Sequence, residues 1–194
     1  SGNRIKLTGN IVNQSSTPQT VNLPLVIDAA ADRSFDATNG HIVFASSLTY
    51  TNLGVTARSY KKSGTNELVI TGTTLVTNLY SRFTLDEGTL RFAPGSRFDL
   101  VDTSNERNIL RIGNVANKKS ALIVETNAAV ALGGLTLQMN GVTGGTGTFD
   151  LLVDGGTLAL TGTDNTFGDQ TGNRATVVID HGGLLTNTSA SSVL

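Results

Sequence analysis

The chain of 194 residues contains no cysteine and no tryptophan, and only 5% of it is aromatic. Without cysteine it can form no disulfide, no thiolate metal site and no cysteine nucleophile. Charged residues are also scarce, at 15%, and the formal net charge is -1. The arginines and lysines are scattered along the sequence and form no cationic stripe suited to a phosphate backbone. We therefore expect no nucleic acid partner.

Long apolar runs are absent as well. No stretch approaches the roughly 18 to 20 apolar residues of a membrane-spanning helix. Residues 1–4 lack the apolar core of a signal peptide. The sequence therefore predicts no membrane insertion of this segment.

Small and turn-forming residues dominate instead, since glycine, threonine, asparagine and serine fill 82 positions. Leucine, valine and isoleucine supply nearly all the apolar side chains, and their number is sufficient for one core. This composition argues against disorder. The length and the few aromatics favour a single domain over residues 1–194.

The apolar residues alternate with a period of two, which is typical of half-buried strands. No window longer than about two turns has the spacing of an amphipathic helix. The alternating pairs are Ile5 and Leu7, Leu25 and Ile27, Ile42 and Phe44, Leu68 and Ile70, Leu90 and Phe92, Leu110 and Ile112, Leu122 and Val124, Leu135 and Leu137, Leu158 and Leu160, and Val177 and Ile179. The sequence therefore predicts an all-β protein of short strands.

Glycines recur before many of these strands at a regular spacing. Gly40, Gly64 and Gly88 follow one another at intervals of 24 residues, and Gly156 and Gly183 are 27 residues apart. An aliphatic-Thr-Gly motif recurs at residues 7–9, 70–72 and 160–162, where a strand would turn a corner. This periodicity predicts a parallel β-solenoid of about nine coils, each of about 18 to 27 residues and with two or three strands.

An antiparallel sandwich or barrel is the competing architecture, since it also uses short strands and glycine-rich turns. It would place tight two-residue turns between neighbouring strands. The pairs Asn39-Gly40, Asn140-Gly141 and Asp154-Gly155 instead lie at positions that match the coil period. The turn chemistry therefore favours the solenoid.

Two stretches resemble a known family. Residues 62–72 with 87–92, and residues 155–167 with 177–184, each follow a Gly-x-Leu-x-Leu-Thr-Gly-like strand with a second glycine-led strand about twenty residues later. This pattern resembles the autotransporter-associated β-strand repeat of bacterial type V secretion passengers. Asn165-Thr166-Phe167 lies where that family favours Asn-Thr-Tyr, whereas Gly72 is not followed by such a triplet. The resemblance implies a right-handed parallel β-helix at the cell surface, but no single activity.

Candidate catalytic groups are few. His41 and His181 each stand beside a glycine at the start of a strand, and His181 has Asp180 beside it and Ser189 downstream. Adjacent strand residues face opposite sides, so Asp180 is poorly placed to orient His181 in a triad. We interpret both histidines as solvated turn residues. The sequence predicts no catalytic, cofactor-binding or metal-binding residues.

Paired acids are the one alternative with a defined chemistry, because sugar-cleaving β-helices use two or three carboxylates on one face. Aspartate also favours turns, which explains most of these positions without catalysis. The candidate acids are Asp28, Asp32 and Asp36; Asp86 and Glu87; Asp99 and Asp102; Asp150 and Asp154; and Asp164 and Asp169.

We expect a non-enzymatic structural or adhesive segment of an extracellular passenger on a bacterial cell surface, with a host-surface or glycan ligand. The alternative is a carbohydrate-active β-helix of the tailspike or polysaccharide-lyase kind. Display loops are expected at residues 12–21, 28–39, 103–107 and 164–174. Because neither terminus resembles a capping helix, we expect the solenoid to continue into further coils or to stack end to end as a filament.

Overall fold

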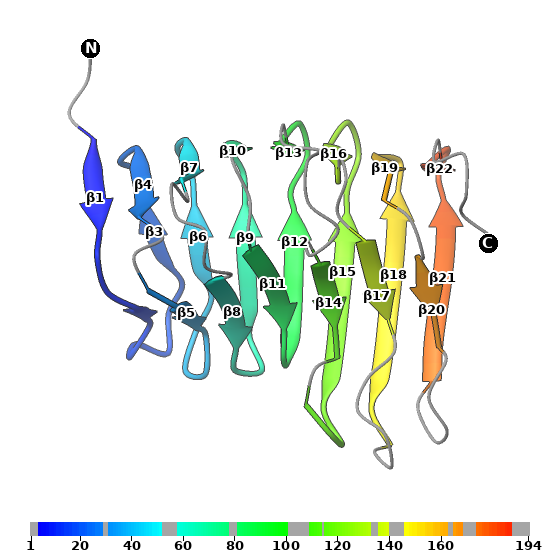
Figure 1. Cartoon of the computed structure of the whole chain (residues 1–194), viewed down its shortest axis with the longest axis horizontal. Helices are drawn as coiled ribbons and strands as arrows, with labels where there is room; N and C mark the ends of the chain where they lie inside the picture. The colour runs from blue at the N-terminus through cyan, green and yellow to red at the C-terminus, as the bar shows by residue number, and fades with distance from the viewer. Residues whose placement is uncertain are drawn as a thin grey trace.

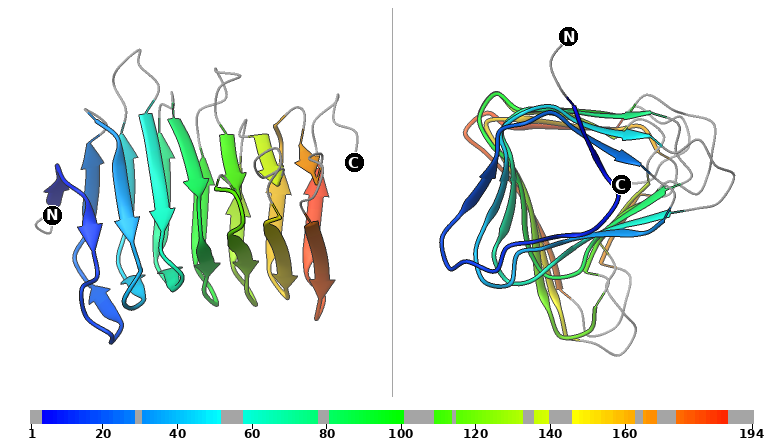
Figure 2. Two further views of the ribbon diagram at one scale, coloured as in Figure 1. Left: turned by 90° about the horizontal axis from the view of Figure 1, so that it is seen from below. Right: turned by 90° about the vertical axis from the view of Figure 1, so that its left-hand side faces the viewer.

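The computed structural model describes residues 4–28, 31–51, 58–77, 81–100, 109–113, 115–132, 136–139, 146–162, 165–168 and 174–187. This part of the chain consists of strands and their connections, without helices, which confirms the all-β prediction. Three parallel sheets run side by side along a rod, with β1 at one end and β22 at the other (Figure 1). Viewed along the rod, the sheets form the sides of a triangle (Figure 2). The fold is a parallel β-solenoid. No helix long and apolar enough to cross a membrane occurs among the described residues.

We name the three sheets A, B and C, and each coil contributes one strand to each of them. Sheet A consists of β1 (Ile5–Leu7), β4 (Leu25–Asp28), β7 (Leu48–Thr51), β10 (Thr73–Thr77), β13 (Arg97–Leu100), β16 (Ala129–Ala131), β19 (Thr157–Leu160) and β22 (Leu184–Asn187). Sheet B consists of β2 (Ile11–Val12), β5 (Arg33–Asp36), β8 (Arg58–Ser63), β11 (Ser81–Leu85), β14 (Ile109–Ile112), β17 (Thr136–Met139) and β20 (Thr166–Phe167). Sheet C consists of β3 (Gln19–Val21), β6 (Ile42–Phe44), β9 (Glu67–Ile70), β12 (Gly88–Phe92), β15 (Lys119–Val124), β18 (Thr148–Asp154) and β21 (Arg174–Asp180).

The solenoid has fewer coils than the sequence predicts. In the described residues, sheet A has eight strands and sheets B and C have seven each, which makes seven coils and one further strand. Leu90 pairs with Leu122, and Leu122 pairs with Leu151, so these two coils take 32 and 29 residues. The prediction of nine coils was wrong because the glycines mark different corners. Gly88 begins β12 in sheet C, whereas Gly156 precedes β19 in sheet A.

Three of the four expected display loops contain strands. Residues 28–39 contain β5, which pairs with β2 on one side and β8 on the other. Residues 13–18 connect β2 to β3, but β3 itself lies within the expected loop of residues 12–21. Residues 164–174 contain β20, and residues 103–107 lie outside the described part of the chain. The prediction at β5 was wrong because most residues of this strand are polar. A strand of a solenoid can form with a single apolar residue in the core, and in β5 this residue is Phe35.

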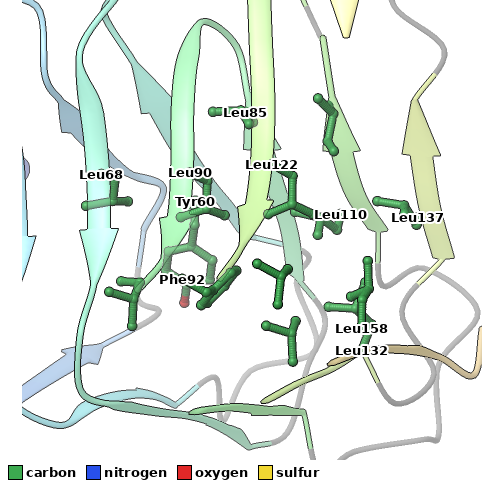
Figure 3. Close-up of a cluster of buried hydrophobic side chains, with 14 of the residues drawn as sticks. Tyr60, Leu68, Leu85, Leu90, Phe92, Leu110, Leu122, Leu132, Leu137 and Leu158 are labelled. Carbon is green, nitrogen blue, oxygen red and sulfur yellow. The ribbon is translucent and has the colours of Figure 1, made fainter. Parts of the chain in front are cut away.

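The core consists of inward-facing aliphatic ladders, as the alternation predicts. Leu68, Leu90 and Leu122 occupy successive positions of one ladder in sheet C, and all three are buried. Figure 3 shows these leucines beside Tyr60 and Phe92 in the interior. Coils stacked about 4.8 Å apart cover each other's inward side chains. A few aromatics therefore suffice, because each aliphatic residue is buried by the coils above and below it.

Glycine is required where the corners of successive coils stack between sheets B and C. Gly64 and Gly88 have φ angles of +82° and +77°. A Cβ atom on Gly88 would lie 2.4 Å from the carbonyl oxygen of Gly64 in the preceding coil. Only glycine combines this backbone conformation with so close an approach. The regular occurrence of glycine at the corner positions of Gly64 and Gly88 therefore has a steric cause.

The buried hydroxyl of Thr74 in the core gives rise to a testable prediction about stability. Thr74 of β10 faces inward between Leu48 and Phe98, and its Oγ1 has no hydrogen-bond partner in the described structure. We expect Thr74→Val to raise the free energy of unfolding by about 1 kcal/mol, because a buried polar group without a partner is destabilising. Urea denaturation followed by circular dichroism measures this change. Thr73→Val is the matched control, since Thr73 is exposed on the same strand. Equal effects of the two substitutions would contradict the prediction.

Candidate functional site

The two ends of the solenoid expose apolar side chains that the inner coils bury. Ile5 in β1 occupies the same inward ladder as Leu25 in β4, yet Ile5 is 44% exposed and Leu25 only 5%. At the other end, Ile179 in β21 is 51% exposed, whereas its ladder partner Val153 in β18 is fully buried. The difference arises because β1 and β21 each have a neighbouring strand on one side only.

Each end therefore presents three strand edges around an apolar centre, within the part of the chain that the structure describes. We name the edges of β1, β2 and β3 with Ile5 the N-terminal end face. The edges of β20, β21 and β22 with Val177 and Ile179 form the C-terminal end face. Unpaired edges of this kind are templates for pairing with another strand.

His181 links the last two corners between sheets C and A. Its Nδ1 atom lies 2.5 Å from Oδ1 of Asp154 and 3.8 Å from Oδ2 of Asp180. The hydrogen bond to Asp154, with the charges of Asp180 and Asp154, raises the pKa of His181. Sequence spacing indicates only the adjacent Asp180 as a partner of His181, because Asp154 lies one coil earlier in the chain. Ser189, the nucleophile considered for His181, lies outside the described residues.

His41 also contacts a neighbouring coil. Its Nδ1 atom accepts a hydrogen bond of 3.0 Å from the backbone N–H of Glu67, and it lies 3.9 Å from Oε2 of Glu67. Both histidines therefore hold neighbouring coils together, in addition to lying at the turns where the sequence placed them.

Most of the candidate acids that the structure describes are engaged by a cation or by backbone. Asp86 pairs with Lys61 at 3.3 Å, and Glu87 pairs with Lys118 at 3.0 Å. Further contacts are Asp99 with Arg97, Asp154 with His181, Asp32 with the N–H of Ser59, and Asp36 with the N–H and hydroxyl of Thr38. Asp150 is exposed on sheet C. Asp102, Asp164, Asp169 and the side chain of Asp28 lie outside the described residues. Within the described chain, no three His, Asp or Glu residues form a group that could hold a metal ion.

Arg91 forms an ion-pair network on the outer face of sheet C. Its guanidinium donates two hydrogen bonds to Glu67, at 2.9 and 2.5 Å, and one of 2.6 Å to Glu125. The hydrogen bond from Arg91 lowers the pKa of Glu67, and the same contact raises that of Arg91. Because the three residues come from three successive coils, the network supports the stacking of the coils.

A shallow groove of about 430 Å³ crosses the outer face of sheet B, and we name it the sheet B groove. Outward residues of four neighbouring strands and their flanks form it, together with Arg33, which shares an inward ladder with the buried Tyr60. The lining residues are Asn10, Asp32, Arg33, Ser34, Ser59, Lys61, Arg82, Thr84 and Arg111. Sequence reasoning missed this surface, because its cations are more than twenty residues apart along the chain.

Comparison with known proteins finds no matching family model, curated protein or solved structure. The assignment of the fold rests on the geometry of the three sheets.

Proposed function

We propose that this chain is a non-enzymatic structural and adhesive segment of a bacterial extracellular protein of the autotransporter-passenger kind. In this role the solenoid is a rigid rod that extends from the cell and presents its sides to ligands. Its rigidity comes from the coil-to-coil interfaces, which repeat along the axis. The resemblance of residues 62–72 and 155–167 to the autotransporter-associated repeat supports the passenger assignment.

The exposed end faces are the observation that carries the proposal. An inward ladder that ends in a half-exposed Ile179 is complete only when another coil covers it. A further coil of a longer chain, or the N-terminal end face of a second copy, can supply that coil. Strands β1, β2 and β3 of this copy would continue sheets A, B and C in the same parallel direction. Copies of the chain would therefore stack head to tail into filaments.

The engagement of candidate acids in ion pairs supports the non-enzymatic part of the proposal. A carbohydrate-active β-helix, the alternative, would need two carboxylates that face a bound sugar without a competing partner. Asp86, Glu87 and Asp99 each pair with a lysine or an arginine, and Asp154 is hydrogen-bonded to His181.

Head-to-tail stacking predicts axial association of the purified protein. We expect mass to increase with protein concentration in analytical ultracentrifugation, and rods longer than one chain in electron micrographs. Ile179→Lys should shift the material to monomers, because it places a charge in the apolar centre of the C-terminal end face.

Leu75→Lys is the matched control, because Leu75 is exposed on the outer face of sheet A, in the middle of the rod. This variant should assemble like the original protein. A monomeric original protein, or an Ile179→Lys variant that still forms long rods, would contradict stacking through the end faces.

A further inference from the structure

The sheet B groove is cationic, although the chain as a whole carries a net charge of -1. Of the charged residues that line it, four are cations and one is an acid, namely Arg33, Lys61, Arg82 and Arg111 against Asp32. Asp86 neutralises part of the charge of Lys61 from a largely buried position. Even with both acids counted, the groove carries an excess of two positive charges.

The cations lie on four neighbouring strands, which run side by side along the rod (Figure 1). Lys61 of β8, Arg82 of β11 and Arg111 of β14 face outward, whereas Arg33 at the start of β5 shares an inward ladder with Tyr60. At about 4.8 Å between strands, the row of outward cations spans about 10 Å along the axis. Lys61 and Arg111 share one outward ladder, with Thr84 between them. The row therefore suits a chain-like anion that lies along the solenoid axis.

Arg82 is the most available of the four cations. Its side chain is exposed, and it has no ion-pair partner among the described residues. Arg111, in contrast, donates from Nε and Nη2 to the Oε1 atom of Gln138. A ligand carboxylate can accept a charge-assisted hydrogen bond from Arg82 without displacing a described contact.

One buried donor on the groove is without a partner in the described structure. Thr84 is only 7% exposed, and its Oγ1 makes no hydrogen bond. It lies on the outward ladder between Lys61 and Arg111. Buried polar groups nearly always have a partner, so an unbonded one beside a groove indicates a place for a ligand oxygen. A hydroxyl or carboxylate oxygen would satisfy it.

The other lining residues distinguish between classes of polyanion. Asn10, Ser34 and Ser59 offer amide and hydroxyl groups that pair with sugar hydroxyls. None of the described residues that line the groove is aromatic, whereas proteins that bind single-stranded nucleic acid stack bases on aromatic side chains. Four cations are also few for a phosphate backbone.

We propose that the sheet B groove binds an acidic polysaccharide, one with carboxylates on its sugars, laid along the axis across β5, β8, β11 and β14. Extended pyranose chains advance per sugar by a length similar to the strand spacing, so successive carboxylates can meet successive strands. This inference rests on the adhesive part of the proposed function and gives that role a ligand class.

The test is isothermal titration calorimetry with a 1,4-linked oligogalacturonate long enough to cross four strands. We expect binding at about 50 mM salt that weakens markedly at about 200 mM. Arg82→Gln should weaken it about tenfold or more, and the carboxyl-reduced oligosaccharide should not bind. The matched control is Lys119→Gln, which removes an exposed cation on sheet C and should leave affinity unchanged.

Thr84→Val separates ligand contact from a structural role. It should reduce affinity several-fold while leaving the melting temperature equal or higher, because the hydroxyl has no partner in the described structure. Lower affinity accompanied by a lower melting temperature would contradict a direct contact.

The inference would be overturned by an absence of oligogalacturonate binding, or by equal losses in Arg82→Gln and Lys119→Gln. Equal binding of the carboxyl-reduced oligosaccharide would also overturn it. Tighter binding of single-stranded DNA, sensitive to Arg82→Gln, would assign the groove to nucleic acid instead. Filament length measured on the same samples keeps the two proposals apart, since rods that assemble but do not bind would contradict only the ligand class.

Discussion

Lys62→Met is expected to lower the free energy of unfolding by about 1 to 3 kcal/mol, because it leaves three carbonyl oxygens at one corner of the solenoid without their donor. Lys62 faces inward from β8 and is fully buried. Its Nζ donates hydrogen bonds to the carbonyl oxygens of Ser63 at 3.0 Å, Gly64 at 2.5 Å and Glu87 at 2.8 Å. Methionine fills a similar volume but leaves the three carbonyls without this donor. Chemical denaturation followed by circular dichroism measures the loss.

The same residue predicts how stability depends on pH. Burial lowers the pKa of Lys62 from 10.5 to about 8, against the opposing charges of Glu87 and other acids. Between these two values the unfolded chain holds the proton and the folded chain has lost it. The free energy of unfolding should therefore rise with pH, by about 2 kcal/mol between about pH 7 and 9.5.

The rise of the free energy of unfolding with pH should end near pH 10 because of Tyr50. Burial raises the pKa of Tyr50 well above 10.0, so higher pH ionises tyrosine in the unfolded chain first and lowers stability. Lys62→Met should lack the rise below that pH. Lys119→Met serves as the control, because Lys119 is exposed and should change stability by less than about 0.5 kcal/mol. A Lys62→Met variant as stable as this control would contradict the corner role.

Gly113→Ala is expected to destabilise the fold by about 4 kcal/mol or to prevent folding. Gly113 follows β14 with φ at +83°, so any side chain strains its backbone. A Cβ atom would also overlap the buried ring of Phe149, which belongs to β18, four strands later in the chain. The ring has no exposed surface toward which it can move. The thermal midpoint and the urea midpoint both report the effect.

Two further variants separate backbone strain from overlap. Gly95 has φ at +74° but open space where a Cβ would lie, so Gly95→Ala should cost only about 1 to 2 kcal/mol. Phe149→Leu removes the ring atoms, so adding Gly113→Ala to it should cost less than adding Gly113→Ala to the original chain. Equal costs of Gly95→Ala and Gly113→Ala would show that overlap with Phe149 is unimportant.

Strands could be predicted from the sequence where apolar residues alternate, because the alternation depends only on neighbouring residues of one strand. Alternation of apolar residues located β4, β6, β9, β12 and β15, because each places two aliphatic or aromatic residues in the core. It failed at β3, β5 and β20, which lie within expected display loops, and at the number of coils. The Thr-Gly motif ends β1 and β19 in sheet A but β9 in sheet C, so equal motifs do not lie one coil apart.

The candidate surfaces depended on contacts between coils. Lys61 and Lys62 are adjacent in the sequence, yet one is exposed on the sheet B groove and the other is buried beneath the corner. Arg82 and Arg111 come from different coils. A fixed spacing along the sequence does not predict which of these residues lie side by side, because the corners between strands differ in length from coil to coil.

The sequence alone determined that the protein is all-β, that its strands are short and that they stack in parallel, because alternation and glycine spacing are local properties of the chain. The tertiary structure decided how many coils form, which lysine is buried, which acids are paired and where the cations gather. These features depend on register between residues 20 to 32 positions apart, which the hydrogen bonds between coils set.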